Sequence, residues 1–253
     1  MSVDLSIVII TKDEAKNIAG ALESVAWAGD IVVVDSGSSD DTVAIARRFT
    51  DRVFTRGWEG YGAQKNYATG LAAHDWVLSL DADERVSPEL VEEIQEVIRR
   101  SPTVAGYRIP RTNRYLDRWI KSTDWYPDNQ LRLYDRRVAK WNSRYVHESV
   151  TVNGRVGTLR SEILHHAYDG LSDHLSTINR YTTLAANQML TEDRRARWTD
   201  LIAHPPLVFF RNYLLRNGFR DGVPGLIISL MNSYYVFLKF AKLWEQQPRS
   251  RGV

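Results

Sequence analysis

Two aspartates, Asp81 and Asp83, stand directly after a short apolar segment, Trp76–Leu80. The segment has the composition of a buried strand, and open α/β sheets bind their ligands at the carboxyl ends of strands. Two carboxylates at positions i and i+2 there can hold a hard divalent cation through oxygen ligands, while the cation in turn binds a diphosphate. The pattern therefore predicts a metal and diphosphate site at one edge of a sheet.

Polar clusters follow two other apolar runs in the same way. Thr11–Glu14 comes after Leu5–Ile10, and Asp35 comes after Ile31–Val34. Acids at these places can accept hydrogen bonds from a ribose or from the N–H group of a base. Ser39–Asp41 have a structural explanation as the cap and first turn of a following helix, whereas Asp35 has no such explanation in the sequence. Asp35 is therefore the stronger candidate for ligand binding.

The elements that position these residues alternate between strand and helix up to about Ser101. Apolar residues recur at helical spacing over Ala15–Ala26 and over Thr42–Phe49, between the apolar runs. Ser87–Glu89 supplies the capping hydroxyl, the proline at the first helical position and the acid that open a further helix. This alternation predicts βαβ units and a mostly parallel sheet with right-handed crossovers.

After about Ser101 the pattern changes to short extended segments between polar loops, which predicts an antiparallel component. These segments are Val104–Pro110, Gln130–Tyr134 and Tyr145–Val152. From Leu171 the chain becomes helical and contains two very apolar stretches, Leu207–Leu215 and Val223–Phe240. The second approaches membrane-spanning length, but polar residues interrupt it, so we expect it to lie on or dip into a membrane interface.

Charge is distributed unevenly along the chain. From Arg194 onward there are ten Lys and Arg against three acids, a net charge of +7, so the overall +2 leaves −5 for the preceding residues. A basic and apolar end indicates contact with an anionic surface. Membrane phosphate fits better than nucleic acid, because no nucleic-acid-binding motif accompanies the charge. The alternative is an ordinary solvated helical face.

Composition excludes several classes of protein. The 253 residues include no cysteine, which excludes a disulfide framework, a zinc–thiolate site, an iron–sulfur cluster and a thiol nucleophile. A hydrophobic content of 43% with 25% charged residues excludes a disordered chain and a polytopic membrane protein. The first residues lack a basic segment, so we expect them to form a strand and not a signal peptide. Neither the dinucleotide-binding G-x-G-x-x-G pattern nor a P-loop follows the first strand.

Four motifs in order, I-V-I-I-T-K-D-E-A-x-N-I, V-V-D-S-G-S-S-D-D-T, Q-K-N and L-D-A-D-E, resemble the inverting family 2 glycosyltransferases of GT-A fold. The later P-D-N-Q-L-R-L-Y, V-H-E, L-H-H-A-Y and Y-T-T-L-A-A are similar to the lipopolysaccharide-core β-1,4-glucosyltransferase subgroup. The resemblance implies an α/β fold in two parts. Residues 1–170 would form a Rossmann-like GT-A domain that binds a nucleotide-sugar, and residues 171–253 a helical, membrane-associating extension.

The resemblance also implies donor-site roles. Thr11, either Asp13 or Glu14, and Asp35 would hold the nucleoside. Asp83 would be the principal ligand of Mg²⁺ or Mn²⁺. Asp81 would contact either the ribose or the metal.

Three further residues have alternative roles. Lys65, in Q-K-N, would contact the diphosphate, unless it is an exposed helical lysine. His165 would reach the metal or the diphosphate, unless it is a hydrogen-bonded structural histidine. Arg132, in the L-R-L run, would pair with phosphate or with a carboxylate of the sheet.

The catalytic base is expected in the acceptor half. Inverting transfer needs a carboxylate that takes the proton of the acceptor hydroxyl as it attacks C1 of the sugar. GT-A enzymes generally place this acid in an x-E-D motif, and the matching segment here is V-H-E, a departure from it. Glu148 is therefore the first choice and Asp128 the reserve.

The implied activity is transfer of a sugar, glucose by the resemblance, from a UDP-sugar to a lipid-linked saccharide acceptor such as the lipopolysaccharide inner core. The enzyme would be cytoplasmic and peripheral on the inner face of the cytoplasmic membrane, with no nucleic-acid partner. One alternative is transfer to a polyprenyl phosphate, which would also explain the apolar and basic end. The other is a non-catalytic nucleotide-binding membrane scaffold, and the intact acids Asp81, Asp83 and Glu148 argue against it.

Overall fold

The chain folds into two compact units. The structure is a computed structural model that describes residues 3–142, 149–168 and 170–247. Met1–Thr112 and Asp128–His166 form the first unit, here called the sheet unit. Asn113–Pro127 and Ala167–Val253 form the second, here called the helical unit.

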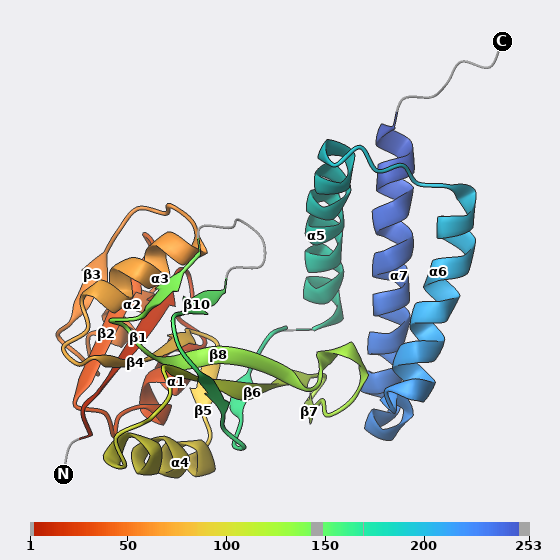
Figure 1. Ribbon diagram of the computed structural model, residues 1–253. Coiled ribbons are helices and arrows are strands. Elements are labelled where there is room, and N and C mark those ends of the chain that lie inside the picture. The colour runs from red at the N-terminus through yellow and green to blue at the C-terminus, as the bar shows by residue number, and fades with distance from the viewer. Residues whose placement is uncertain (1–2, 143–148, 169, 248–253) are drawn as a thin grey trace. The chain divides into compact units, whose positions relative to one another are not determined.

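A parallel sheet forms the first half of the sheet unit, in the order β3-β2-β1-β4 (Figure 1). Its strands are β1 (Leu5–Thr11), β2 (Asp30–Asp35), β3 (Val53–Thr55) and β4 (Trp76–Asp81). The apolar runs Leu5–Ile10, Ile31–Val34 and Trp76–Leu80 are thus strands, and the predicted mostly parallel α/β arrangement is confirmed for this half.

Antiparallel strands extend the sheet beyond β4, which confirms the expected antiparallel component. β8 pairs with β4, β6 pairs with β8, and β12 pairs with β5, each in antiparallel orientation. The bounds are β5 (Glu84–Val86), β6 (Gly106–Tyr115), β8 (Asp128–Asp135) and β12 (Ile163–His165). Two short strands also pair with β6, β7 (Arg118–Trp119) in antiparallel and β11 (Val156–Thr158) in parallel orientation. A separate ribbon pairs β9 (Ala139–Trp141) with β10 (Val150–Val152).

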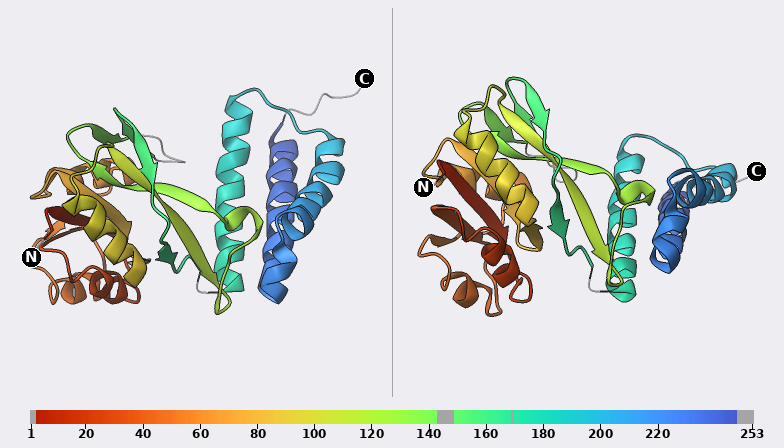
Figure 2. Two further views of the ribbon diagram at one scale, coloured as in Figure 1. Left: turned by 60° about the horizontal axis from the view of Figure 1, so that its bottom comes forward. Right: turned by 90° about the horizontal axis from the view of Figure 1, so that it is seen from below.

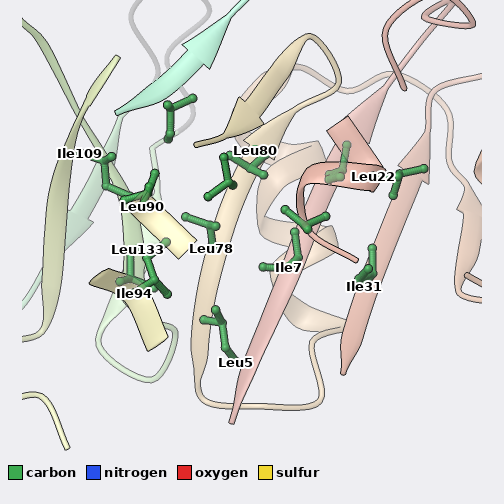
Figure 3. Packing of buried hydrophobic residues seen from close by; sticks show 14 of the residues in the cluster. Leu5, Ile7, Leu22, Ile31, Leu78, Leu80, Leu90, Ile94, Ile109 and Leu133 are labelled. Carbon is green, nitrogen blue, oxygen red and sulfur yellow. The ribbon is translucent and has the colours of Figure 1, made fainter. Parts of the chain in front are cut away.

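Both faces of the parallel strands are covered, which explains their continuous apolar sequences. Alternate residues of β1 enter different clusters: Ile7 lies in the core on the side of α1 and α4, and Val8 in the core on the side of α3. Figure 3 shows the first of these cores. The helices are α1 (Ile18–Ser24), α2 (Thr42–Ala46), α3 (Tyr61–Gly70) and α4 (Pro88–Arg99).

The start of α4 shows how local sequence fixes an element. The Ser87 hydroxyl accepts a hydrogen bond from the backbone N–H of Leu90 at 3.2 Å, and Pro88 occupies the first helical position. Leu90, Ile94 and Ile98 then fall on one buried face. The predicted helix start is therefore confirmed.

Three long helices make up most of the helical unit, and α7 packs against both α5 and α6 (Figures 1 and 2). The elements are η1 (Thr123–Trp125), α5 (Leu171–Thr191), α6 (Trp198–Phe210), a π-helical segment (Arg211–Leu215), a 3-10 turn (Gly218–Asp221) and α7 (Gly222–Gln246). Pro205 and Pro206 lie inside α6 and do not end it. Within the described part of the chain, Gly218–Gln246 is one stretch long and apolar enough to cross a membrane, a property that core helices share.

Candidate active site

The register of the parallel strands brings the predicted donor residues to one edge of the sheet. Thr11 at the end of β1 lies opposite Asp35 at the end of β2. On the other side of β1, Ile10 lies opposite Asp81, the last residue of β4. The carboxyl ends of β2, β1 and β4 thus place Asp35, Thr11 and Asp81 side by side.

Asp35 and Asp13 shape the loop that follows β2. The buried Asp35 carboxylate accepts hydrogen bonds from the backbone N–H groups of Gly37 and Ser38, each at 2.9 Å, and from the Ser38 hydroxyl. The Asp13 carboxylate accepts one from the backbone N–H of Ser39 at 2.7 Å. Asp35 therefore does have a structural role, one that its sequence context had not revealed.

Glu14 lies in the neighbouring loop after β1, and Thr11 is the last residue of that strand. The backbone N–H of Glu14 donates to the Thr42 hydroxyl at 2.7 Å, and its carboxylate accepts from the Asn17 amide at 2.8 Å. The Thr11 hydroxyl is buried and has no hydrogen-bond partner in the part of the chain that the structure describes. The two loops are tied to each other, and Thr11 retains hydrogen-bonding capacity at their base.

Asp81 is held between two buried cations. One carboxylate oxygen lies 2.8 Å from Lys65 Nζ and the other 2.6 Å from an Arg132 terminal nitrogen. Lys65 is only 2% exposed, with its ammonium 4.4 Å from the centre of the Trp141 ring, so the reading of Lys65 as an exposed helical lysine is wrong. Arg132 pairs with the carboxylates of Asp81 and Glu84, as one of the two alternatives for that residue expects.

Burial and neighbouring charges have opposite effects on the pKa of Asp81, which lies between Lys65 and Arg132. Burial alone would raise the pKa of Asp81, but the charges of Arg132 and Lys65 outweigh it and hold that pKa far below its ordinary value. Burial lowers the pKa of Lys65, and the nearby Arg132 charge adds to the effect. Asp81 is thus a firmly ionised carboxylate whose two oxygens already have cationic partners.

Asp83 and His165 form a second pair at this edge. Asp83 Oδ2 lies 3.2 Å from His165 Nε2, and the two side chains are 25% and 15% exposed. Pairing of β12 with β5 brings His165 there, opposite Glu84 in register, and the backbone N–H of His166 donates to the Asp83 carbonyl at 3.0 Å.

The residues at this edge fit a divalent cation shared with a diphosphate, and do not form a complete protein cage. Among the described residues, no three or more His, Cys, Asp or Glu side chains gather as a metal site. Mg²⁺ and related cations in phosphate-binding sites commonly take one or two protein ligands, with phosphate and water completing the set. Asp83 and His165 are adjacent, partly exposed and of ligand type, whereas Asp81 would first have to release Lys65 or Arg132.

The two candidate bases differ in what the structure shows of them. Asp128 accepts two hydrogen bonds from Arg111 at one oxygen, at 2.9 and 2.7 Å, and one from Gln130 at the other, at 2.5 Å. Its oxygens are thus engaged in this arrangement. Glu148 lies outside the described residues.

Glu84 is a site residue that the sequence reasoning missed, although it closes the L-D-A-D-E motif. It is fully buried and touches Arg132, Arg111 and the backbone of Asp81. Its position directly after Asp83 could have indicated a role at the site. Its partners Arg111 and Arg132 lie on strands distant in sequence, so the local residue spacing does not predict these contacts.

The sheet topology agrees with the α/β fold that the family resemblance implied, and comparison with known proteins identifies the family. The family model described as "Glycosyl transferase family 2" matches residues 6–161, more than half of the chain. The chain belongs to this family, which confirms the family resemblance seen in the sequence.

Relatives extend the similarity over nearly the whole chain. It is 30% identical to "Lipopolysaccharide core biosynthesis glycosyltransferase LpsC" of Rhizobium meliloti (strain 1021), over 96% of this chain and 92% of that protein. It is also 30% identical to an uncharacterized glycosyltransferase of Rickettsia felis, over 98% and 92% of the two chains. Among solved structures, S. aureus TarS 1-349 in complex with UDP-GlcNAc has a TM-score of 0.48 and 16% identity, with 97% of this chain and 91% of that chain covered.

Proposed function

We propose that this protein is an inverting glycosyltransferase that moves glucose from a UDP-sugar to the lipopolysaccharide inner core. The observation that carries the proposal is the Asp83–His165 pair beside Asp81, at the carboxyl edge of the sheet of a family 2 chain. Similarity to a protein named for lipopolysaccharide core biosynthesis supports the acceptor class.

The nucleoside would bind at the loops after β1 and β2. Asp13 and Asp35 fix the backbone of residues 37–39, and Glu14 ties the first loop to Thr42. The Thr11 hydroxyl lies at the base of these loops and could pair with the nucleoside. Lys65 would act through Asp81, because its buried ammonium already bonds to that carboxylate.

The chemistry would divide between the two halves of the sheet unit. Asp83 and His165 would hold Mg²⁺ or Mn²⁺, which as a Lewis acid would stabilise charge on the departing UDP. Glu148 would take the proton of the acceptor hydroxyl as that hydroxyl attacks C1 from the face opposite the diphosphate. Asp128 is the weaker candidate for this role, because Arg111 and Gln130 occupy its oxygens.

The helical unit would hold the enzyme peripherally on the cytoplasmic face of an anionic membrane, where a lipid-linked acceptor is found. Its outer surface exposes many large apolar side chains, including Trp198 at 70% and Leu215 at 79%. Basic residues accompany them, since the chain from Arg194 onward carries a net charge of +7. Apolar insertion combined with attraction to anionic lipid is the usual basis of peripheral binding.

The test is transfer with Mn²⁺ from UDP-glucose and, in parallel reactions, from other UDP-sugars to two acceptors, a lipid A–core glycolipid and a polyprenyl phosphate, read by mass spectrometry. We expect one hexose to be added to the core glycolipid. Transfer to the polyprenyl phosphate alone would overturn the proposed acceptor, and transfer of a different sugar would overturn the proposed donor. Binding of UDP without transfer from any UDP-sugar would favour the non-catalytic nucleotide-binding scaffold, and failure to bind UDP would overturn both readings.

A further inference from the structure

A chain of charged side chains with alternating signs runs through the sheet unit behind the candidate donor site. It passes in order through Lys65, Asp81, Arg132, Glu84, Arg111 and Asp128. The successive contacts measure 2.8, 2.6, 2.8, 3.0 and 2.7 Å. It thereby joins the carboxylate at the end of β4 to the reserve base on β8.

Glu84 lies at the centre of this chain and is its most completely buried carboxylate, with no exposed surface. One carboxylate oxygen accepts hydrogen bonds from Arg132 at 2.8 Å and from Arg111 at 3.0 Å. The other accepts the backbone N–H of Asp81 at 3.0 Å. Glu84 therefore holds both arginines and the peptide group that begins the Asp81–Asp83 turn.

The position of Glu84 in the chain and in the sheet connects it to both Asp83 and His165. It follows Asp83 directly in the chain and lies opposite His165 in the pairing of β5 with β12. A shift of the Glu84 side chain would therefore move the turn that carries Asp81 and Asp83, together with the strand edge at His165.

Stability alone gives a poor reason for this arrangement. Well-packed apolar side chains usually stabilise a fold as well as a buried ion pair does or better, because burying charge costs desolvation energy. Groups that orient metal ligands from behind, in contrast, are regularly charged or hydrogen-bonded. Two nitrogens of Arg132 are buried without a hydrogen-bond partner in the described residues, so the cluster is not optimised for hydrogen bonding.

We infer that Glu84 is a positioning residue of the donor site. It acts through the backbone of Asp81 and through Arg132 to set the geometry in which Asp83 and His165 receive a divalent cation and the diphosphate. This inference rests on the proposed function, because it assigns Glu84 to the same UDP-sugar site.

The test measures binding of UDP in the presence of Mn²⁺ by titration calorimetry, which requires neither the sugar nor the acceptor. Glu84→Gln keeps the shape of the side chain and removes its charge, whereas Glu84→Asp keeps the charge and shortens the reach. We expect each to weaken UDP binding by about 10- to 100-fold, the usual effect of losing a group that orients metal ligands. Circular dichroism establishes that each variant is folded.

Asp30→Asn is the matched control. Asp30 is also a buried carboxylate that accepts hydrogen bonds from an arginine, Arg52, and from a backbone N–H, that of Ala73 at 2.8 Å. It lies at the opposite end of the same sheet, at the start of β2. We expect this variant to lose melting temperature and to bind UDP within about twofold of wild type.

The outcomes separate the inference from the proposed function. If wild-type protein does not bind UDP with Mn²⁺, the proposed function is overturned and this inference with it. If wild type binds and folded Glu84→Gln and Glu84→Asp bind equally well, only the inference is overturned. Equal loss of binding in Asp30→Asn, or failure of both Glu84 variants to fold, would make Glu84 a residue of general stability and would also overturn it.

Discussion

Asp81 and Asp83 belong to one motif, yet the structure gives their carboxylates different surroundings. Asp81 faces Lys65 and Arg132, while Asp83 faces His165 across 3.2 Å. A carboxylate with two cationic partners is a poor starting point for metal binding, whereas a carboxylate beside an imidazole is a good one. We therefore propose that the motif consists of a fixed anchor, Asp81, followed by a metal ligand, Asp83.

Replacing Asp83 tests that division. Asp83→Ala removes the ligand from a partly exposed turn, so the melting temperature should hardly change. Loss of metal stabilisation worth several kcal/mol in the transition state corresponds to a fall in turnover of about 10²-fold or more. UDP release from UDP-glucose measures it, and Asp51→Ala, an exposed aspartate before β3, is the control. Turnover near the wild-type level with unchanged metal dependence would show that the site is misassigned.

The catalytic base can be assigned by two amide substitutions. Glu148→Gln keeps the size of the side chain but cannot accept the proton of the acceptor, so transfer should fall by about 10²- to 10⁴-fold. Affinity for UDP should barely change. Asp128→Asn is the comparison, and the rates come from steady-state kinetics with saturating donor. If Asp128→Asn shows the large loss and Glu148→Gln does not, the order of the two candidates is reversed.

Among the secondary-structure elements, the strands and helices with an apolar face could be predicted from the sequence. Helix α3, which lacks such a face, could not. Strands β1, β2 and β4 are continuous apolar runs, and α4 has both a capping serine and a buried apolar stripe. Helix α3 instead buries Gln64, Lys65 and Thr69, so no hydrophobic period marks it. The sequence therefore allowed Lys65 to be an exposed helical lysine. In the structure, α3 packs a partly polar face against the sheet and Lys65 is buried there.

The carboxyl ends of the strands could also be predicted as ligand-binding positions. The side-chain pairs that form between residues of different strands could not. The pairing of β12 with β5 brings His165 to Asp83, and the strands β6 and β8 bring Arg111 and Arg132 to Glu84. Such contacts depend on antiparallel register between segments distant in sequence. A single sequence carries no spacing rule for them.

His174 of α5 makes the helical unit sensitive to acid. It is buried among the rings of Tyr115, Trp125 and Tyr168, and its Nδ1 lies 2.9 Å from the Tyr115 hydroxyl. Burial lowers its pKa from 6.5 to about 4, which outweighs the opposite effect of Asp173. Between these values the unfolded chain takes up a proton that the folded chain does not. The free energy of unfolding should therefore fall as pH falls through this window, by about 3 kcal/mol in total.

The measurement is thermal unfolding of wild type and of His174→Gln between pH 7 and pH 4. Glutamine can pair with the Tyr115 hydroxyl and does not titrate, so this variant should lose less stability over that range. Parallel curves for the two proteins would contradict the assignment.

At the scale of the whole molecule, apolar and basic residues gather on the same unit. On α7, residues Val223, Leu230, Phe237 and Trp244 recur every seven positions, so they share one face, and all four are exposed. Phe240 and Leu243 lie buried in the bundle core. The apolar sequence of α7 therefore serves both packing within the bundle and an exposed surface.

Liposome flotation tests whether that surface docks on membranes. Arg211 and Arg216 both pair with Asp124, so reversing their charge would disturb the fold. We predict that wild type floats with phosphatidylglycerol vesicles at low salt and that reversal of Arg194, Arg195 and Arg220 to Glu releases it. Each basic residue near an anionic leaflet contributes on the order of 1 kcal/mol.

The control reverses the same number of exposed arginines in the sheet unit, Arg47, Arg48 and Arg155. That variant should still float, since its change in net charge is the same but lies elsewhere. Absence of wild-type binding, or equal release of both variants, would disprove docking through the helical unit.

We propose that Asp83 and His165 receive a divalent cation together with the diphosphate of a nucleotide. Electron spin echo envelope modulation of Mn²⁺ added with UDP tests it most directly, because the method detects nitrogen and phosphorus nuclei bound to the ion. We predict both signals in wild type and in His166→Gln, and loss of the nitrogen signal alone in His165→Gln. Phosphorus without nitrogen in wild type, or a nitrogen signal that persists in His165→Gln, would overturn the assignment of His165 as a ligand of the cation.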